Sequence, residues 1–166
     1  MTMREQLDQE LNRLTTSGGP SGQTLSVAVD TEHGRLECEF AVVGAIGCDL
    51  VRCRWGTVRL ADASIEMLKT VCESLAAKLI YLLEPISPVE IDGQDVVVQM
   101  RSNPPHRDDQ GTSYYELLVR RSGFCLQRFS KAPGQPRSAV VAHVTREVLA
   151  RLGDDFAATV AGLDES

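Results

Sequence analysis

Residues 25–55 read LSVAVDTEHGRLECEFAVVGAIGCDLVRCRW, and this stretch decides the fold because apolar and polar side chains alternate through most of it. A period of two is typical of strands that bury one face and expose the other. His33-Gly34 suits a two-residue turn, and residues 44–47 form a glycine-bounded loop. The stretch therefore predicts an antiparallel meander of three strands.

The two turns also predict which side chains face one another, because cross-strand partners share a face of the sheet. On the buried face the predicted partners are Val29 with Cys38, Cys38 with Cys53, and Leu36 with Trp55. On the wet face they are Glu39 with Arg52 and Glu37 with Arg54. Each of these ion pairs is worth about 0.2–1 kcal/mol.

The predicted pairing of Cys38 with Cys53 brings two thiols close enough for a strained cross-strand disulfide or a redox pair. Buried packing is the favoured interpretation, because cysteine is among the most buried residue types. The chain has 5 cysteines and no CxxC pair, which argues against a secreted disulfide framework. Because residues 1–14 also lack an apolar signal-like core, we expect a cytoplasmic protein.

Two helices flank the meander. Residues 2–15 predict an amphipathic helix, with Thr2 and Glu5 at capping-box spacing, and residues 17–22 predict a flexible Gly/Ser/Pro hinge. The first helix therefore docks either on its own body or on a partner. The strongest helical period covers residues 65–83, with Ser64 as a cap and Glu84-Pro85 as the stop.

The last turns of the helix predicted over residues 65–83 are apolar on nearly every side. We expect the sheet to cover one side, and the first helix or a second subunit to cover the other. The candidate interface residues are Leu79, Tyr81, Leu82 and Leu83. Charged side chains inside this helix exclude a membrane span, so no membrane partner is expected.

The second half of the chain predicts two more strand pairs and a last helix. The predicted strands are 89–91, 95–101, 113–121 and 124–130, the last two joined by a turn at Ser122-Gly123. Residues 102–112 are expected to form one long polar loop. Ser138 is expected to cap the last helix, and Gly153 is expected to end it.

These elements predict an α+β fold in which helices pack on an antiparallel β-sheet of two meander or hairpin groups, in the order α-βββ(β)-α-ββ-ββ-α. We expect residues 1–22 to form the helix and hinge, and residues 23–166 to form a single α+β domain. This succession is similar in outline to the secretion-chaperone class, whose dimeric members hold a partner chain along their surface. The similarity is one of element order.

Charge is distributed unevenly along the 166 residues, whose formal net charge is −6. Residues 1–100 carry 8 basic and 15 acidic side chains, whereas residues 101–151 carry 9 and 4. The acidic total excludes a uniformly basic nucleic-acid binder and leaves nucleic acid a disfavoured partner. If the basic segment takes an anionic ligand, the candidate contacts are Arg101, His106, Arg107, Tyr114, Arg120 and Arg128. The favoured alternative is that these arginines pair with acidic side chains of the same chain.

Catalytic motifs give little support to an enzyme, because the sequence contains no GxGxxG, GxxxxGK[ST], HExxH or GxSxG pattern and no zinc spacing. No metal or cofactor is therefore predicted. The leading hypothesis is a non-enzymatic protein-interaction or adaptor module, chaperone-like and homodimeric. The alternative is a binder of an anionic small molecule or nucleotide, or an enzyme acting on one, with its site in the loops of residues 101–137.

Overall fold

The computed structural model describes residues 1–17 and 22–165, so most of the predicted hinge lies outside the described residues. These residues contain three α-helices, α1 (Met3–Ser17), α2 (Ile65–Lys78) and α3 (Arg146–Ala161), and a short 3-10 turn, η1 (Gly162–Glu165), follows α3. The strands are β1 (Leu25–Thr31), β2 (Gly34–Val43), β3 (Gly47–Gly56), β4 (Ile86–Asp92), β5 (Val97–Ser102), β6 (His106–Asp108), β7 (Gly111–Arg120), β8 (Gly123–Lys131), β9 (Ser138–Val140) and β10 (Ala142–Thr145).

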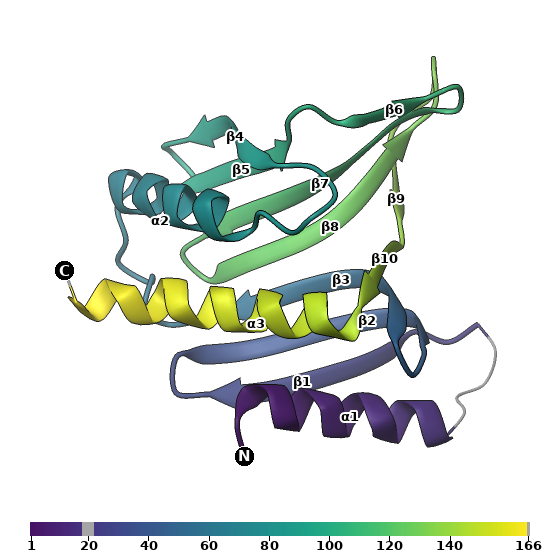
Figure 1. The fold of residues 1–166 in the computed structure, drawn as a ribbon. Helices are drawn as coiled ribbons and strands as arrows, with labels where there is room; N and C mark the ends of the chain where they lie inside the picture. The colour runs from purple at the N-terminus through teal and green to yellow at the C-terminus, as the bar shows by residue number, and fades with distance from the viewer. Residues whose placement is uncertain (18–21, 166) are drawn as a thin grey trace.

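The ten strands of the described residues form one antiparallel sheet with the main order β1-β2-β3-β8-β7-β5-β4, while β10 pairs with β3, β6 with β7, and β9 with β8. The three helices lie on the same face of this sheet (Figure 1). The predicted α+β fold with helices packed on an antiparallel sheet is confirmed.

Two similar units meet in the middle of the sheet. In each unit three strands precede a helix, namely β1-β2-β3 before α2 and β5-β7-β8 before α3. The strands β3 and β8 join the units through the ladder from Cys53 opposite Leu126 to Gly56 opposite Gly123. This short ladder is the junction at which both units meet edge to edge.

The hairpin registers differ from the prediction by two residues. The β1–β2 turn is Glu32-His33, so Val29 faces Leu36 and not Cys38. Gly34 is the first residue of β2, with φ +150, and a Cβ there would lie 2.4 Å from the carbonyl oxygen of Gly56. The glycine is required beside the neighbouring strand and not inside the turn.

The β7–β8 hairpin shows the same displacement. Its turn is Arg121-Ser122, and Gly123, with φ +137, opens β8. Tyr115 therefore faces Arg128 and not Ser130. A shift of two residues keeps every side chain on its predicted face, which is why the alternation of buried and exposed positions remains correct.

The β2–β3 register matches the prediction over four residue pairs, including Cys38 opposite Cys53 and Leu36 opposite Trp55. Beyond them an irregularity shifts the ladder, so Phe40 faces Leu50 and not Val51. Such bulges insert an extra residue into one strand, and sequence alternation does not reveal them.

The boundaries of α2 and α3 correct the sequence prediction. The helix α2 ends at Lys78 and not at residue 83, and Leu79 is its C-cap residue. Ser138 begins β9, whereas Thr145 caps α3 by accepting a hydrogen bond from the amide of Val148. Gly153 lies inside α3 and not at its end. A glycine is needed there because Met3 of α1 occupies the space that a Cβ would take.

Residues 102–112, between β5 and β7, are not the single long loop that the sequence predicts. The strand β6 crosses this segment and pairs with the start of β7, with Asp108 opposite Gly111. Its three residues are exposed.

The helix α1 docks on its own body, against β1 and α3. Leu7 and Leu11 are buried, and Arg4 forms ion pairs with Asp154 and Glu147 of α3. Thr2 and Glu5 make the expected capping box, with the Thr2 amide donating to Glu5 at 2.7 Å and the Glu5 amide donating to the Thr2 hydroxyl at 3.2 Å.

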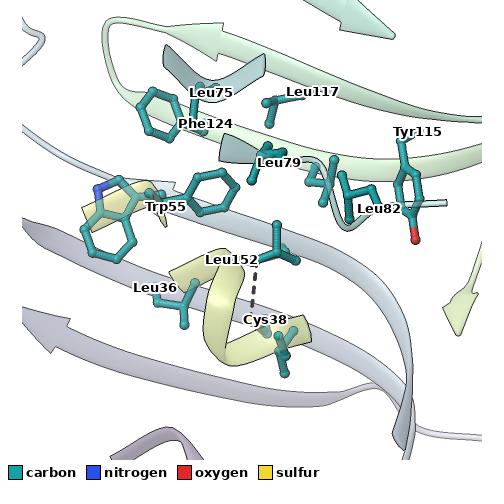
Figure 2. Close-up of a cluster of buried hydrophobic side chains, with 14 of the residues drawn as sticks. Leu36, Cys38, Trp55, Leu75, Leu79, Leu82, Tyr115, Leu117, Phe124 and Leu152 are labelled. Carbon is teal, nitrogen blue, oxygen red and sulfur yellow. Dashed lines mark hydrogen bonds between the residues drawn. The ribbon is translucent and has the colours of Figure 1, made fainter. Parts of the chain in front are cut away.

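The core fills the layer between the helices and the sheet (Figure 2). Trp55, Leu36 and Phe124 come from the sheet, while Leu75 and Leu152 come from α2 and α3. Cys38 and Cys53 lie in this layer as free thiols with their sulfur atoms 3.7 Å apart.

Alkaline pH is expected to destabilise the fold through its buried thiols. Burial raises the pKa of Cys72 to about 12 from its ordinary value of 9.0. The hydrogen bond with Cys53 and burial raise the pKa of Cys38 as well. Because the unfolded thiols release protons first, unfolding becomes easier as pH rises from 9 toward 12, whereas stability below pH 9 does not depend on these thiols.

Thiol labelling with mass spectrometry, together with urea unfolding between pH 7 and 11, measures this effect. At pH 8 we expect Cys125, which is half-buried, to react before the four buried cysteines, and all five to react after unfolding. Fewer than five labels on the unfolded chain without reductant would contradict free thiols, and a pH-independent unfolding midpoint would contradict the raised pKa values.

Candidate functional site

The face of the sheet that carries no helix, here called the open face, is the candidate site. Its side chains alternate along each strand with the buried core residues. Over the central strands they are Glu37 and Glu39 on β2, Arg52 and Arg54 on β3, Cys125, Gln127 and Phe129 on β8, Tyr114, Glu116, Leu118 and Arg120 on β7, and Gln99 and Arg101 on β5.

Two of the predicted ligand contacts come together on the open face. The guanidinium carbon of Arg101 lies 4.7 Å from the ring centre of Tyr114, a cation–π distance. The Nε atom of Arg101 is buried and has no hydrogen-bond partner within the described part of the chain. Arg120 projects from the same face at the other end of β7.

Arg137 belongs to this group, although it was not among the predicted contacts. Its guanidinium lies 3.9 Å from the ring centre of Phe129 and donates to Glu116 at 2.5 Å. Gln99 donates to the same carboxylate at 2.7 Å. The raised pKa of Arg137 follows from its hydrogen bonds to Glu116 and Tyr114. Hairpin alternation places Tyr114 and Glu116 on one face, but no sequence signal brings the loop residue Arg137 to them.

Arg128 lies on the opposite face, inside the core layer. Its guanidinium donates two hydrogen bonds to Glu84, at 3.1 and 3.3 Å, and sits 4.7 Å from the ring centre of Tyr115. Only 9% of the Arg128 side chain and 11% of the Glu84 side chain are exposed. This buried pair stabilises the end of the α2–β4 connection and does not meet the open face.

His106 and Arg107 lie on the exposed strand β6, where Arg107, opposite Thr112, is on the open face beyond Tyr114, and His106, opposite Ser113, is on the helix side. The imidazole of His106 approaches Asp108 at 3.5 Å. Arg107 faces Thr112 of β7. The structure therefore does not gather the six predicted ligand contacts into a single site.

The predicted interface residues follow α2 and are mostly turned inward. Leu79 and Leu82 are buried in the core of the same chain (Figure 2). The Tyr81 hydroxyl donates to Asp155 at 2.7 Å, and burial together with this bond raises the pKa of Tyr81. Leu83 and its neighbour Ile80 are each 75% exposed. A homodimer stays a prediction. Of this segment, Ile80 and Leu83 are the apolar side chains that could contact a second subunit.

A hollow of about 340 Å³ opens on the open face at the β3–β8 junction. Gly56 and Gly123 face each other there without side chains. The hollow is lined by Glu37, Arg54, Trp55, Gly56, Leu118, Arg120, Ser122, Gly123, Phe124 and Cys125. Burial raises the pKa of Cys125, and a hydrogen bond from Arg54 opposes that rise.

Within residues 1–17 and 22–165, no three His, Cys, Asp or Glu side chains gather as a metal site would require. None of the helices described there is long and apolar enough to span a membrane. No protein-family model, curated protein or solved structure matches this chain.

Proposed function

We propose that this chain is a non-enzymatic protein-interaction module that holds an extended, acidic segment of a partner protein against its open face. The observation that carries the proposal is the group of arginine and aromatic side chains on this face, where no helix covers the sheet. An antiparallel sheet commonly leaves one face to water, so the lack of a covering helix does not by itself indicate a binding surface.

Composition supports a binding role for the open face. Arginine, tyrosine and phenylalanine are enriched in protein interfaces, whereas lysine and glutamate are depleted there. Arg101 with Tyr114, and Arg137 with Phe129, form two such pairs side by side. A planar guanidinium resting on a ring is held in place, so it loses less freedom when it binds a carboxylate.

Charge supports an acidic partner. The chain carries a net charge of −6, yet on the central strands of this face the four arginines Arg52, Arg54, Arg101 and Arg120 outnumber the three glutamates Glu37, Glu39 and Glu116. An acidic segment is attracted to this face and repelled by the rest of the chain, which fixes where it docks.

Addition of a partner strand to the β4 edge of the sheet is the less favourable mode. The outer strand β4 contains Pro88, which lacks an amide hydrogen, and its ladder with β5 is irregular between Pro88 and Glu90. Both features hinder strand addition at an edge. The face, and not this edge, therefore suits an extended segment.

Selection of random twelve-residue peptides displayed on phage tests the proposal. We expect enrichment of peptides that combine Asp or Glu with apolar residues. Alternation along β8 places the exposed Lys131 on the open face with Phe129. The affinity of these peptides, measured by fluorescence anisotropy, should therefore fall at least tenfold in the Arg101→Glu/Lys131→Glu variant, because two attractive charges of the open face become repulsive. Arg13→Glu/Lys69→Glu makes the same charge change on the helices α1 and α2 and should bind within twofold of wild type.

Equal loss of binding in both variants would show general charge attraction and would contradict the proposed surface. Absence of any enriched peptide would contradict the proposal as a whole. Melting curves of both variants establish that the comparison is made on folded protein.

A further inference from the structure

The hollow at the β3–β8 junction has a floor without side chains because Gly56 and Gly123 are direct cross-strand partners. The two positions differ in what they tolerate. A Cβ at Gly123 would lie 1.8 Å from the carbonyl oxygen of Trp55, whereas a Cβ at Gly56 would meet no atom within 4 Å. Packing therefore requires glycine at position 123, while the space above Gly56 is open.

Arg54 borders this space without the partner predicted for it. Glu37 is its cross-strand neighbour, as expected, but the Glu37 carboxylate pairs with Nε of Arg35 at 3.2 Å. The other predicted ion pair does form, between Glu39 and Arg52 at 3.7 Å. The Arg54 guanidinium has the thiol of Cys125, its cross-strand partner on β8, as its neighbour.

Arg120 borders the same hollow from β7. In the described part of the chain, neither Arg54 nor Arg120 forms an ion pair with a carboxylate. Their strands are separated by β8, so about 10 Å of sheet lies between them. Two arginine side chains on opposite sides of such a gap can both reach a group that sits in the middle.

We propose that this hollow binds one anionic group, a carboxylate or a phosphate, between the guanidinium groups of Arg54 and Arg120. Guanidinium groups recognise the paired oxygens of such anions through charge-assisted hydrogen bonds. The Ser122 hydroxyl, also in the lining, is a further donor. Leu118 on the same wall contacts the carbon chain that carries the anion.

The source of the anion rests on the proposed function, under which an acidic side chain of the partner segment fills the hollow. A free small anion is the other source of the same chemistry. The volume of about 340 Å³ accommodates either one. Glu37, which is also in the lining, limits the site to one anionic group, because a second would face a carboxylate.

Nuclear magnetic resonance titration of the full chain tests the site with defined probes. The probes are succinate, inorganic phosphate, a blocked nine-residue peptide with a central glutamate, and the same peptide with glutamine there. We expect saturable shifts of the Arg54 and Arg120 Nε–H signals and of the Gly56 amide with the glutamate peptide. The glutamine peptide should bind at least fivefold more weakly.

Gly56→Leu is the decisive variant, because a Cβ at this position meets no atom within 4 Å, so a larger side chain projects into the hollow while both arginines are kept. It should abolish the saturable shifts while the melting temperature stays within a few degrees of wild type. Arg54→Ala/Arg120→Ala should weaken binding at least tenfold. The control Arg13→Ala/Lys69→Ala should bind like wild type.

The probes and variants distinguish the possible results. Saturable shifts that persist in Gly56→Leu, or equal non-saturating shifts of all exposed arginines, would overturn the site. Binding of succinate or phosphate without binding of the glutamate peptide would support the anion site and overturn its role in holding a partner. Peptides that bind the open face but not this hollow would overturn the site while the proposed function stands.

Discussion

Gly123→Ala is expected to lower the free energy of unfolding by roughly 3 kcal/mol. The φ of Gly123 is +137, a conformation that residues with a Cβ rarely adopt. The added methyl group would also stand 1.8 Å from the carbonyl oxygen of Trp55. Backbone cannot swing aside as a side chain does, so β3 and β8 must separate at the ladder that joins the two units.

Gly56→Ala is the matched control, since Gly56 faces Gly123 in the same ladder. Its Cβ has open space, so the substitution restricts the unfolded chain without straining the folded one. We expect it to leave stability unchanged or to raise it by about 0.5 kcal/mol. Urea unfolding followed by tryptophan fluorescence compares the variants, because Trp55 lies at the junction. Similar stabilities for the two variants would contradict the close approach at Gly123.

The glycines also show why the sequence predicts the faces of the sheet better than its register. Alternation of apolar and polar residues is read directly from the sequence, and Leu36, Cys38 and Trp55 are buried as it predicts. A glycine next to a turn has two interpretations, either a turn residue or a position pressed against a neighbouring strand. The choice depends on β3, which no local pattern connects to Gly34 or Gly123.

The candidate site is less predictable from the sequence than the fold, because its contacts also depend on which strands are neighbours. Composition located the basic segment, and strand alternation brings Arg101 and Tyr114 to one face. Neither signal reveals that Arg128 lies on the opposite face or that Glu37 turns to Arg35 and leaves Arg54. The order of the strands decides these contacts, and that order is a property of long-range packing.

The predicted helix ends are wrong where tertiary burial outweighs the local sequence pattern. The apolar run after Lys78 continues the helical pattern, yet Leu79 and Leu82 are buried in a non-helical connection that leads to β4. Gly153 resembles a helix end, but it is the position where Met3 crosses α3 at close range. In both places tertiary packing, which the sequence does not display, sets the local conformation.

Arg128→Met is expected to lower the free energy of unfolding by about 3 kcal/mol, because it leaves the carboxylate of Glu84 without its partner. The Glu84 side chain is 11% exposed, so water replaces the two lost hydrogen bonds poorly. Methionine keeps the length and much of the apolar stem of arginine, which limits the loss of contacts with Tyr115. The cost therefore arises mainly from the stranded charge.

The double variant Arg128→Met/Glu84→Gln separates this cost from lost packing. With the stranded carboxylate replaced by a neutral amide, we expect recovery of at least half of the stability lost in the single variant. Urea unfolding of the wild type, both single variants and the double variant gives the coupling free energy of the pair. A coupling near zero would mean that the two residues act independently and would contradict a buried ion pair. Peptide binding to folded Arg128→Met should match wild type, because the Arg128 side chain lies on the helix side of the sheet while the open face keeps its own arginines.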